Sequence, residues 1–212
     1  MIIDLIMVNT VFWSFLLGYK SSPKITLYKP LILVISFILT LNIHNNVAIF
    51  SQEKVVKTIL DNDYVIQVSE ENSHREYLLT KSFVDELPVT TQMQNKIIEN
   101  YYKDNTGYLI DELVETAGKT ITKSMEVLLV LTIVIVFLNV VGSITLFKRK
   151  STGSISSGVI TVISNLIVVS IIILLINLIS VFLLKDIPKI SLEGSLFTPL
   201  IHKIIDFVIN TI

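Results

Sequence analysis

The sequence contains no cysteine and few charged residues. None of its 212 residues is Cys, and only 17% are Asp, Glu, Lys or Arg. The lack of Cys excludes disulfide bonds, thiolate metal sites and cysteine nucleophiles. Because a soluble chain carries about 25% charged residues, this composition excludes an ordinary soluble domain. The formal net charge of −1 provides no concentrated basic surface of the kind that binds nucleic acid.

Long apolar runs take the place of the missing charge. The chain is 51% hydrophobic and has a mean hydropathy of +0.70. A helix that crosses a membrane needs about 20 mostly apolar residues, and four segments come close to this length: residues 2–18, 27–50, 127–147 and 159–184. Residues 2–18 lack the basic start and the small-residue cleavage site of a signal peptide. We therefore predict an all-α integral membrane protein with four transmembrane helices.

Basic residues in the short loops predict the orientation. Lys20, Lys24 and Lys29 lie in the first loop, and Lys148, Arg149 and Lys150 lie in the last, without any acid. Such loops stay in the cytoplasm, so both termini and the long middle segment are expected outside. The predicted layout is two transmembrane helices in residues 1–50, an acidic extracytoplasmic segment in 51–126, two more transmembrane helices in 127–184, and an extracytoplasmic tail in 185–212.

The middle segment is acidic and mostly helical by its spacing. Residues 51–126 hold 8 basic and 14 acidic residues, a net charge of 8 − 14 = −6. We expect helices at 51–60 and from Thr90 to about Lys103, a small hairpin within 64–80, and a helix that starts near residue 108 and runs unbroken into the third span. In the tail, Thr198 and Pro199 favour the start of an amphipathic helix that ends at Ile212.

Polar residues inside the predicted spans are the first candidates for function. No ionisable residue is expected inside a span, where its burial would cost several kcal/mol. The spans do contain Asn139, Ser143, Asn165 and Asn177. Such residues either line a path for a polar solute or form hydrogen bonds between helices, each worth about 1 kcal/mol. The second reading is favoured.

The pattern of histidines and carboxylates gives no sign of catalysis. His44, His74 and His202 are far apart and lack the His-x-x-x-His spacing of a zinc site. The carboxylates at 85–86 and 111–115 are not accompanied by a Gly-x-Ser-x-Gly nucleophile motif. We therefore predict no metal site, no cofactor and no catalytic residue, and we expect the protein not to be an enzyme.

Short motifs along nearly the whole chain suggest a family resemblance. Asp4 and an apolar span precede Gly18-Tyr19-Lys20, and a second span follows. A glycine-rich stretch runs from Gly153 to Gly158 before the last span. Further motifs are Glu86-Leu87-Pro88 in the middle segment and Ser195-Leu196-Phe197 after the last span. Together these features resemble the colicin V production protein (CvpA) family of bacterial membrane proteins.

The resemblance implies a bacterial plasma (inner) membrane protein that is linked to toxin (bacteriocin) production or export and to envelope maintenance. It brings no catalytic residues. The partners it implies are the lipid bilayer and other membrane or envelope proteins, and self-association stays open. Two other functions remain open: a sensor or immunity-type protein that binds an envelope component through residues 51–126, and a transport or channel subunit whose asparagines face water.

Overall fold

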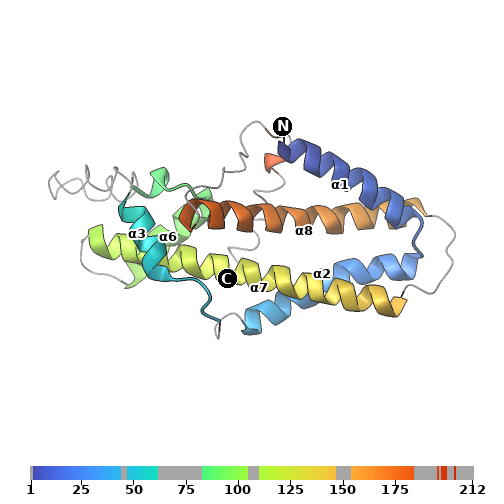
Figure 1. Cartoon of the computed structure of the whole chain (residues 1–212), viewed down its shortest axis with the longest axis horizontal. Coiled ribbons are helices and arrows are strands. Elements are labelled where there is room, and N and C mark those ends of the chain that lie inside the picture. The colour runs from blue at the N-terminus through green and yellow to red at the C-terminus, as the bar shows by residue number, and fades with distance from the viewer. Residues whose placement is uncertain are drawn as a thin grey trace. The chain divides into compact units, whose positions relative to one another are not determined.

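The part of the chain described by the computed structural model is helical. It comprises residues 2–43, 47–61, 83–104, 110–146 and 154–183, with residues 195, 197–199 and 203. The helices are α1 (Ile2–Tyr19), α2 (Pro23–Ile43), α3 (Gln52–Leu60), α6 (Thr91–Asp104), α7 (Ile110–Leu146) and α8 (Ile155–Phe182) (Figure 1). Since these residues include no strand, the predicted all-α class is confirmed for them. The hairpin predicted within 64–80 lies outside the described residues.

Three helices are long and apolar enough to cross a membrane. Their candidate spans are Thr26–Ile43 in α2, Glu112–Gly142 in α7 and Ile155–Phe182 in α8. Helix α1 is also apolar, from Ile3 to Tyr19, but it is shorter than the other three candidates. Length and composition thus support a membrane protein with three such helices among the described residues, while the fourth crossing stays a prediction.

Helix α2 lies closer to the amino terminus than the predicted span 27–50. It begins at Pro23, a residue suited to the first helical turn because that turn needs no N–H donor from it, and it ends at Ile43. Residues 47–50 are not helical. Lys29 lies inside the apolar segment Thr26–Ile43, as it does inside the predicted span 27–50, so the prediction that no ionisable residue lies inside a span is wrong at this position.

The chain divides into two compact units. The first unit consists of Met1–Val47, Val127–Leu175 and Ile190–Ile204, and the second of Ala48–Glu126, Ile176–Lys189 and Ile205–Ile212. Helices α7 and α8 each contribute residues to both units. The predicted boundaries at 50 and 126 fall close to two of these divisions, whereas the division within α8 has no counterpart in the predicted layout.

The second unit has an ordinary amphipathic core. Helix α3 buries Val55 and Ile59, and α6 buries Met93, Ile97 and Tyr101, all at helical spacing. Thr58 Oγ1 donates a hydrogen bond to the Phe182 carbonyl oxygen over 3.1 Å. The helices predicted at 51–60 and from Thr90 to about Lys103 are confirmed as α3 and α6.

Helix α7 is a single helix of 37 residues. At a rise of 1.5 Å per residue it is about 55 Å long, well beyond the roughly 30 Å that a membrane crossing requires. The prediction of a helix that continues without a break into the third span is therefore confirmed. In the tail, residues 198, 199 and 203 are helical, and the rest of the predicted amphipathic helix lies outside the described residues.

Candidate functional site

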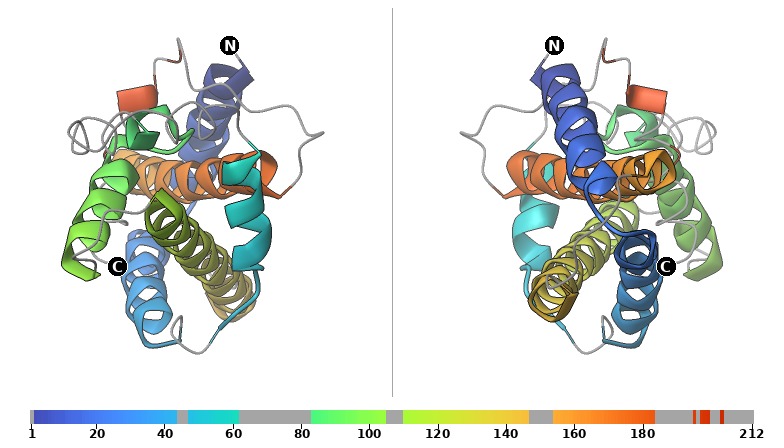
Figure 2. Two further views of the ribbon diagram at one scale, coloured as in Figure 1. Left: turned by 90° about the vertical axis from the view of Figure 1, so that its left-hand side faces the viewer. Right: turned by 90° about the vertical axis from the view of Figure 1, so that its right-hand side faces the viewer.

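In the first unit, α1 and α8 lie against each other (Figures 1 and 2), and small residues form their contact. A Cβ atom on Gly18 would lie 2.5 Å from Thr161 Oγ1 and 2.7 Å from the Ser157 carbonyl oxygen. A Cβ atom on Gly158 would lie 2.7 Å from the Phe15 ring. Small residues at such positions let two helix backbones approach each other, as is typical of helix pairs in membranes.

A hydrogen bond between side chains continues this contact along both helices. Asn165 Nδ2 donates to Ser14 Oγ over 2.8 Å. Because Gly18 meets Thr161 while Ser14, one turn earlier, meets Asn165, the two helices run antiparallel. Asn165, one of the four predicted polar residues, thus bonds to a side chain of another helix.

The other three predicted polar residues are on α7 and α8. Asn139 Nδ2 donates to the Ile135 carbonyl oxygen of its own helix over 2.8 Å. Asn177 is half-buried on α8 and belongs to the second unit. Ser143 lies near the end of α7, and its side chain is outside the described part. Asn139 and Asn165 thus have different hydrogen-bond partners, a backbone carbonyl oxygen of α7 for Asn139 and a side chain of α1 for Asn165.

Helix α2 turns its polar side inward, which the sequence reasoning missed. Thr26, Ser36 and Thr40 are buried and Lys29 is half-buried. At about 100° per residue these four positions fall within roughly 80° of arc. The side exposed by the same helix is apolar: Leu27, Leu31, Val34, Ile35, Ile38 and Leu39. An apolar exterior and a polar interior are typical of a helix in lipid, where polar residues face the bundle. The spacing of the hydroxyl residues along the sequence could have revealed this row.

Buried hydroxyls in the first unit have unused hydrogen-bonding capacity. Within the described ranges, Ser36 Oγ, Ser157 Oγ and Thr161 Oγ1 are buried without a hydrogen-bond partner. An unsatisfied buried polar group costs about 1–3 kcal/mol. The packing of the surrounding helices therefore has to offset this cost at the three hydroxyls.

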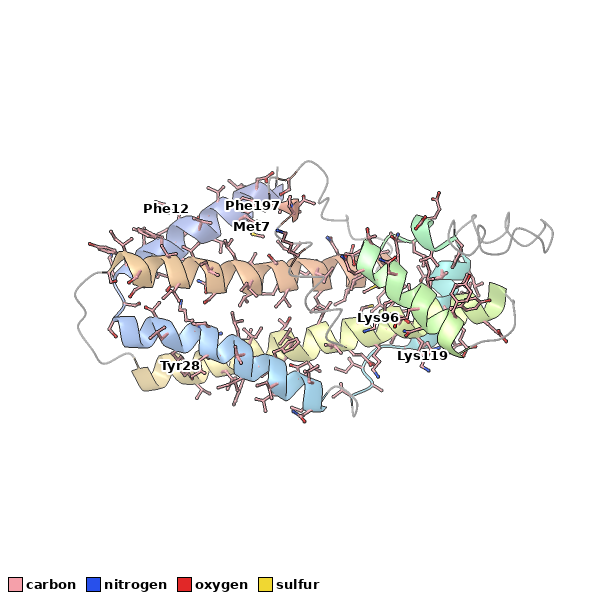
Figure 3. The ribbon with its side chains drawn as sticks, turned by 180° about the vertical axis from the view of Figure 1, so that it is seen from behind. Met7, Phe12, Tyr28, Lys96, Lys119 and Phe197 are labelled. Carbon is pink, nitrogen blue, oxygen red and sulfur yellow. The ribbon has the colours of Figure 1, made fainter. Side chains whose placement is uncertain are left out.

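A second helix pair in the first unit meets at a glycine. A Cβ atom on Gly142 of α7 would collide with the Tyr28 ring of α2. Figure 3 shows Tyr28 on α2 beside α7. Gly142 is buried, while the apolar residues Val140 and Val141 beside it on α7 are exposed. The α2–α7 contact thus also relies on a residue without a side chain.

Residues from the two ends of the chain meet at the start of α1. Ser195 Oγ donates a hydrogen bond to Asp4 Oδ1 over 2.8 Å and accepts one from the Phe197 backbone N–H over 3.2 Å. Ser195 is buried and Asp4 is half-buried. Asp4 is therefore a hydrogen-bond acceptor for the segment after α8, in addition to lying at the end of an apolar helix.

Two residues of the family-like motifs, Lys20 and Gly153, remain to be placed. Lys20 is exposed directly after α1, and Gly153 lies outside the described residues. The described ranges hold no group of three or more His, Asp or Glu residues that could bind a metal ion.

The second unit contains a cleft between α3 and α7. Its volume is about 460 Å³. It is lined by Gln52, Glu53, Val56 and Leu60 of α3 and by Val114 and Glu115 of α7. Glu53 and Glu115 are exposed, so two carboxylates border an opening with apolar walls. The sequence places Glu115 only among the carboxylates at 111–115 that lack a nucleophile motif, because the tertiary structure is what brings α3 alongside them.

The fold defines a helical protein with three described helices that are able to cross a membrane. Comparison of the chain with protein-family models, with curated proteins and with solved structures finds no match.

Proposed function

We propose that the protein crosses a bacterial plasma membrane four times, through α1, α2, α7 and α8. The exposed side chains of α1, among them Leu5, Val8, Phe12, Trp13 and Leu17, are apolar. Its 18 residues amount to about 27 Å of helix, close to the roughly 30 Å hydrocarbon thickness. Both properties support a span for α1 as well.

The proposed orientation places the basic loops in the cytoplasm. The termini and residues 51–126 then lie outside the membrane, and the first half of α7 extends out of it as a rigid helix. Support comes from the length of α7, about 55 Å, and from the loop charges that the positive-inside rule uses. The acidic net charge of residues 51–126 is consistent with this arrangement.

Within this membrane the protein is proposed to act without catalysis, in toxin (bacteriocin) production or export and in envelope maintenance. The CvpA resemblance is the origin of this role. The observation that carries it is the hydrogen bond between Asp4 and Ser195, because it joins the first and last motifs of the resemblance. Asp4 and Ser195 are separated by 191 positions in the sequence, and they nevertheless contact each other directly.

Single cysteines test the proposed orientation, since the chain has none of its own. Cys is introduced separately at Ser73, Ser151 and Asn210, and whole cells are labelled with a membrane-impermeant maleimide. We expect Ser73→Cys and Asn210→Cys to react in intact cells and Ser151→Cys to react only after lysis. Reaction of Ser151→Cys in intact cells together with protection of Ser73→Cys would invert the orientation, and the export role would lose its basis.

A transport or channel subunit is the second candidate, favoured by the inward polar row of α2. Thr26, Lys29, Ser36 and Thr40 would then face a polar solute, and the unpartnered Ser36 hydroxyl would be free to bond it. The test is glycerol influx into proteoliposomes. Ser36→Leu is expected to abolish the influx, while Val34→Leu on the exposed side of α2 keeps it. No influx with the unmodified protein would eliminate this candidate for small neutral solutes.

A further inference from the structure

The cleft of the second unit lies beside a close contact between its two helices. A Cβ atom on Gly118 of α7 would collide with Val56 Cγ2 of α3. The side chains at Gln52, Val56 and Leu60 follow one another at intervals of four residues, so they form one ridge of α3. The contact of α3 with α7 beside the cleft thus leaves no room for a side chain at residue 118.

The walls and the rim of the cleft differ in chemistry. Val56, Leu60 and Val114 line the cleft with apolar side chains; Leu60 is 41% exposed and Val114 only 1%. Glu53 and Glu115 place carboxylates at the rim, one on each helix, and Gln52 adds an amide. A volume of about 460 Å³ is within the range of sites that hold small ligands or side chains.

We propose that this cleft binds a cationic amphipathic peptide. An apolar side chain of the peptide would occupy the wall of Val56, Leu60 and Val114, and a Lys or Arg of the peptide would pair with Glu53 and Glu115. Charge complementarity selects this occupant, because the two rim carboxylates repel anions and residues 51–126 carry a net charge of −6 that attracts cations over a longer range.

Neighbouring lysines limit how strong the pairing can be. Lys57 and Lys119 follow Glu53 and Glu115 by four residues and are exposed, but they do not line the cleft. Residues four apart on a helix are neighbours, so each lysine competes with the peptide for its glutamate. Binding should therefore need both the apolar contact and the charge, and it should weaken as the salt concentration rises.

The proposal rests on the proposed location of residues 51–126 outside the membrane, where such a peptide would reach them. The test uses the full chain in phosphatidylcholine nanodiscs and a fluorescent 12-residue peptide of repeated Leu-Leu-Lys-Lys, measured by anisotropy against empty nanodiscs. The cleft variant combines Glu53→Gln with Glu115→Gln. The matched control combines Asp85→Asn with Glu86→Gln, which removes the same charge from exposed positions of the same unit.

We expect saturable binding to the unmodified chain, at least a tenfold loss of affinity in the cleft variant, and less than a twofold loss in the control. A peptide with Ser in place of Leu should bind at least tenfold more weakly at the same charge. Equal losses in both variants, or no binding beyond that of empty nanodiscs, overturn the proposal.

Two further outcomes separate this proposal from the proposed function. If light scattering shows that the cleft variant changes the oligomeric state of the chain, a second copy occupies the cleft and the peptide proposal fails. If cysteine labelling inverts the orientation while saturable cleft binding persists, the proposed function fails and the binding chemistry stands.

Discussion

At the scale of single residues, glycine and small hydroxyl residues decide how the helices of the first unit meet. Gly18 faces the Ser157 carbonyl oxygen and Thr161, which are parts of the neighbouring helix. A backbone atom can move only with its whole helix. Gly142 faces the end of the Tyr28 ring, which can rotate away. An added side chain should therefore be tolerated less at Gly18 than at Gly142.

Gly18→Ala is expected to destabilise the protein by about 1–3 kcal/mol, the usual cost of overpacking a tight contact. Gly142→Ala should cost less, because Tyr28 can yield. Thermal unfolding in detergent, followed by circular dichroism, gives both values. Equal stability of the unmodified protein and Gly18→Ala would show that α1 and α8 are not in close contact.

Lys96 gives a prediction that depends on pH. It lies on α6 in the second unit, as Figure 3 shows. Burial lowers the pKa of Lys96 below its usual value, Glu99 raises it and Lys123 lowers it. Folding thus disfavours the charged form of Lys96 and lowers the free energy of unfolding when the side chain is charged. This loss of stability is present below the pKa of Lys96 in the folded protein, and it disappears as the pH rises towards the pKa of an unfolded lysine, about 10.4.

The stability of the unmodified protein relative to Lys96→Met should therefore increase as the pH is raised from neutral towards about 10.4. The effect should be small, because Lys96 is only partly buried and water screens its charge. Chemical unfolding of both proteins across this pH range measures it. Lys119→Met, at an exposed position on α7, serves as the control. If the stability of the unmodified protein relative to Lys96→Met falls with rising pH, burial does not lower the pKa of Lys96.

At the scale of elements, helix α2 of the first unit reverses the rule for soluble helices. Helix α2 exposes leucine, isoleucine and valine and buries threonine and serine, whereas α3 and α6 in the second unit bury their apolar side chains. The hydrophobic effect accounts for both arrangements if lipid surrounds α2 and water surrounds α3 and α6. The same reasoning applies to α1, which exposes most of its large apolar residues.

Trp13, the only tryptophan of the chain, tests whether α1 enters the bilayer. Its side chain is 57% exposed near the middle of α1. We expect lipids with brominated acyl chains to quench its fluorescence strongly in proteoliposomes. The matched control, Tyr102→Trp in a Trp13→Phe background, places the fluorophore at an exposed position of α6. It should respond to iodide in water instead. Quenching of Trp13 by iodide alone would remove α1 from the set of spans.

At the scale of the whole molecule, the bond between Asp4 and Ser195 connects the beginning of the chain to the segment after the last long helix. Such a bond closes a loop of nearly the whole sequence. A hydrogen bond to a charged group contributes about 1.5–3 kcal/mol, which is enough to hold a segment in place.

Ser195→Ala and Asp4→Asn are each expected to speed the cleavage of the tail by a protease, by roughly a factor of ten for each 1.4 kcal/mol lost. The protein in nanodiscs is digested with trypsin, which cuts after Lys185, Lys189 and Lys203, and the products are followed by mass spectrometry. Asn9→Ala, at an exposed position on α1, should leave the rate unchanged. Identical rates in all variants would show that this bond does not restrain the tail.

Three features followed from the sequence alone: the helical class, three of the long apolar helices and the continuous helix through residue 126. These features depend on local composition and on periodicities within one segment, which hold wherever the segment packs. The start of α2 was missed because Leu27 was taken as the beginning of the apolar run, although the helix begins before its first long apolar stretch. Lys29 lies inside the predicted span 27–50, but it was counted with the basic residues of the first loop.

Which polar residues meet depends on how distant segments pack in the folded chain. Asn165 was predicted as a polar packing residue from its position in a span, but its partner Ser14 lies 151 residues away, beyond any local pattern. The same holds for Asp4 with Ser195, for Gly18 with Thr161, and for the two carboxylates at the α3–α7 cleft. Contacts between distant segments depend on which helices pack together and at what rotation, and a single sequence does not encode this in any short-range spacing.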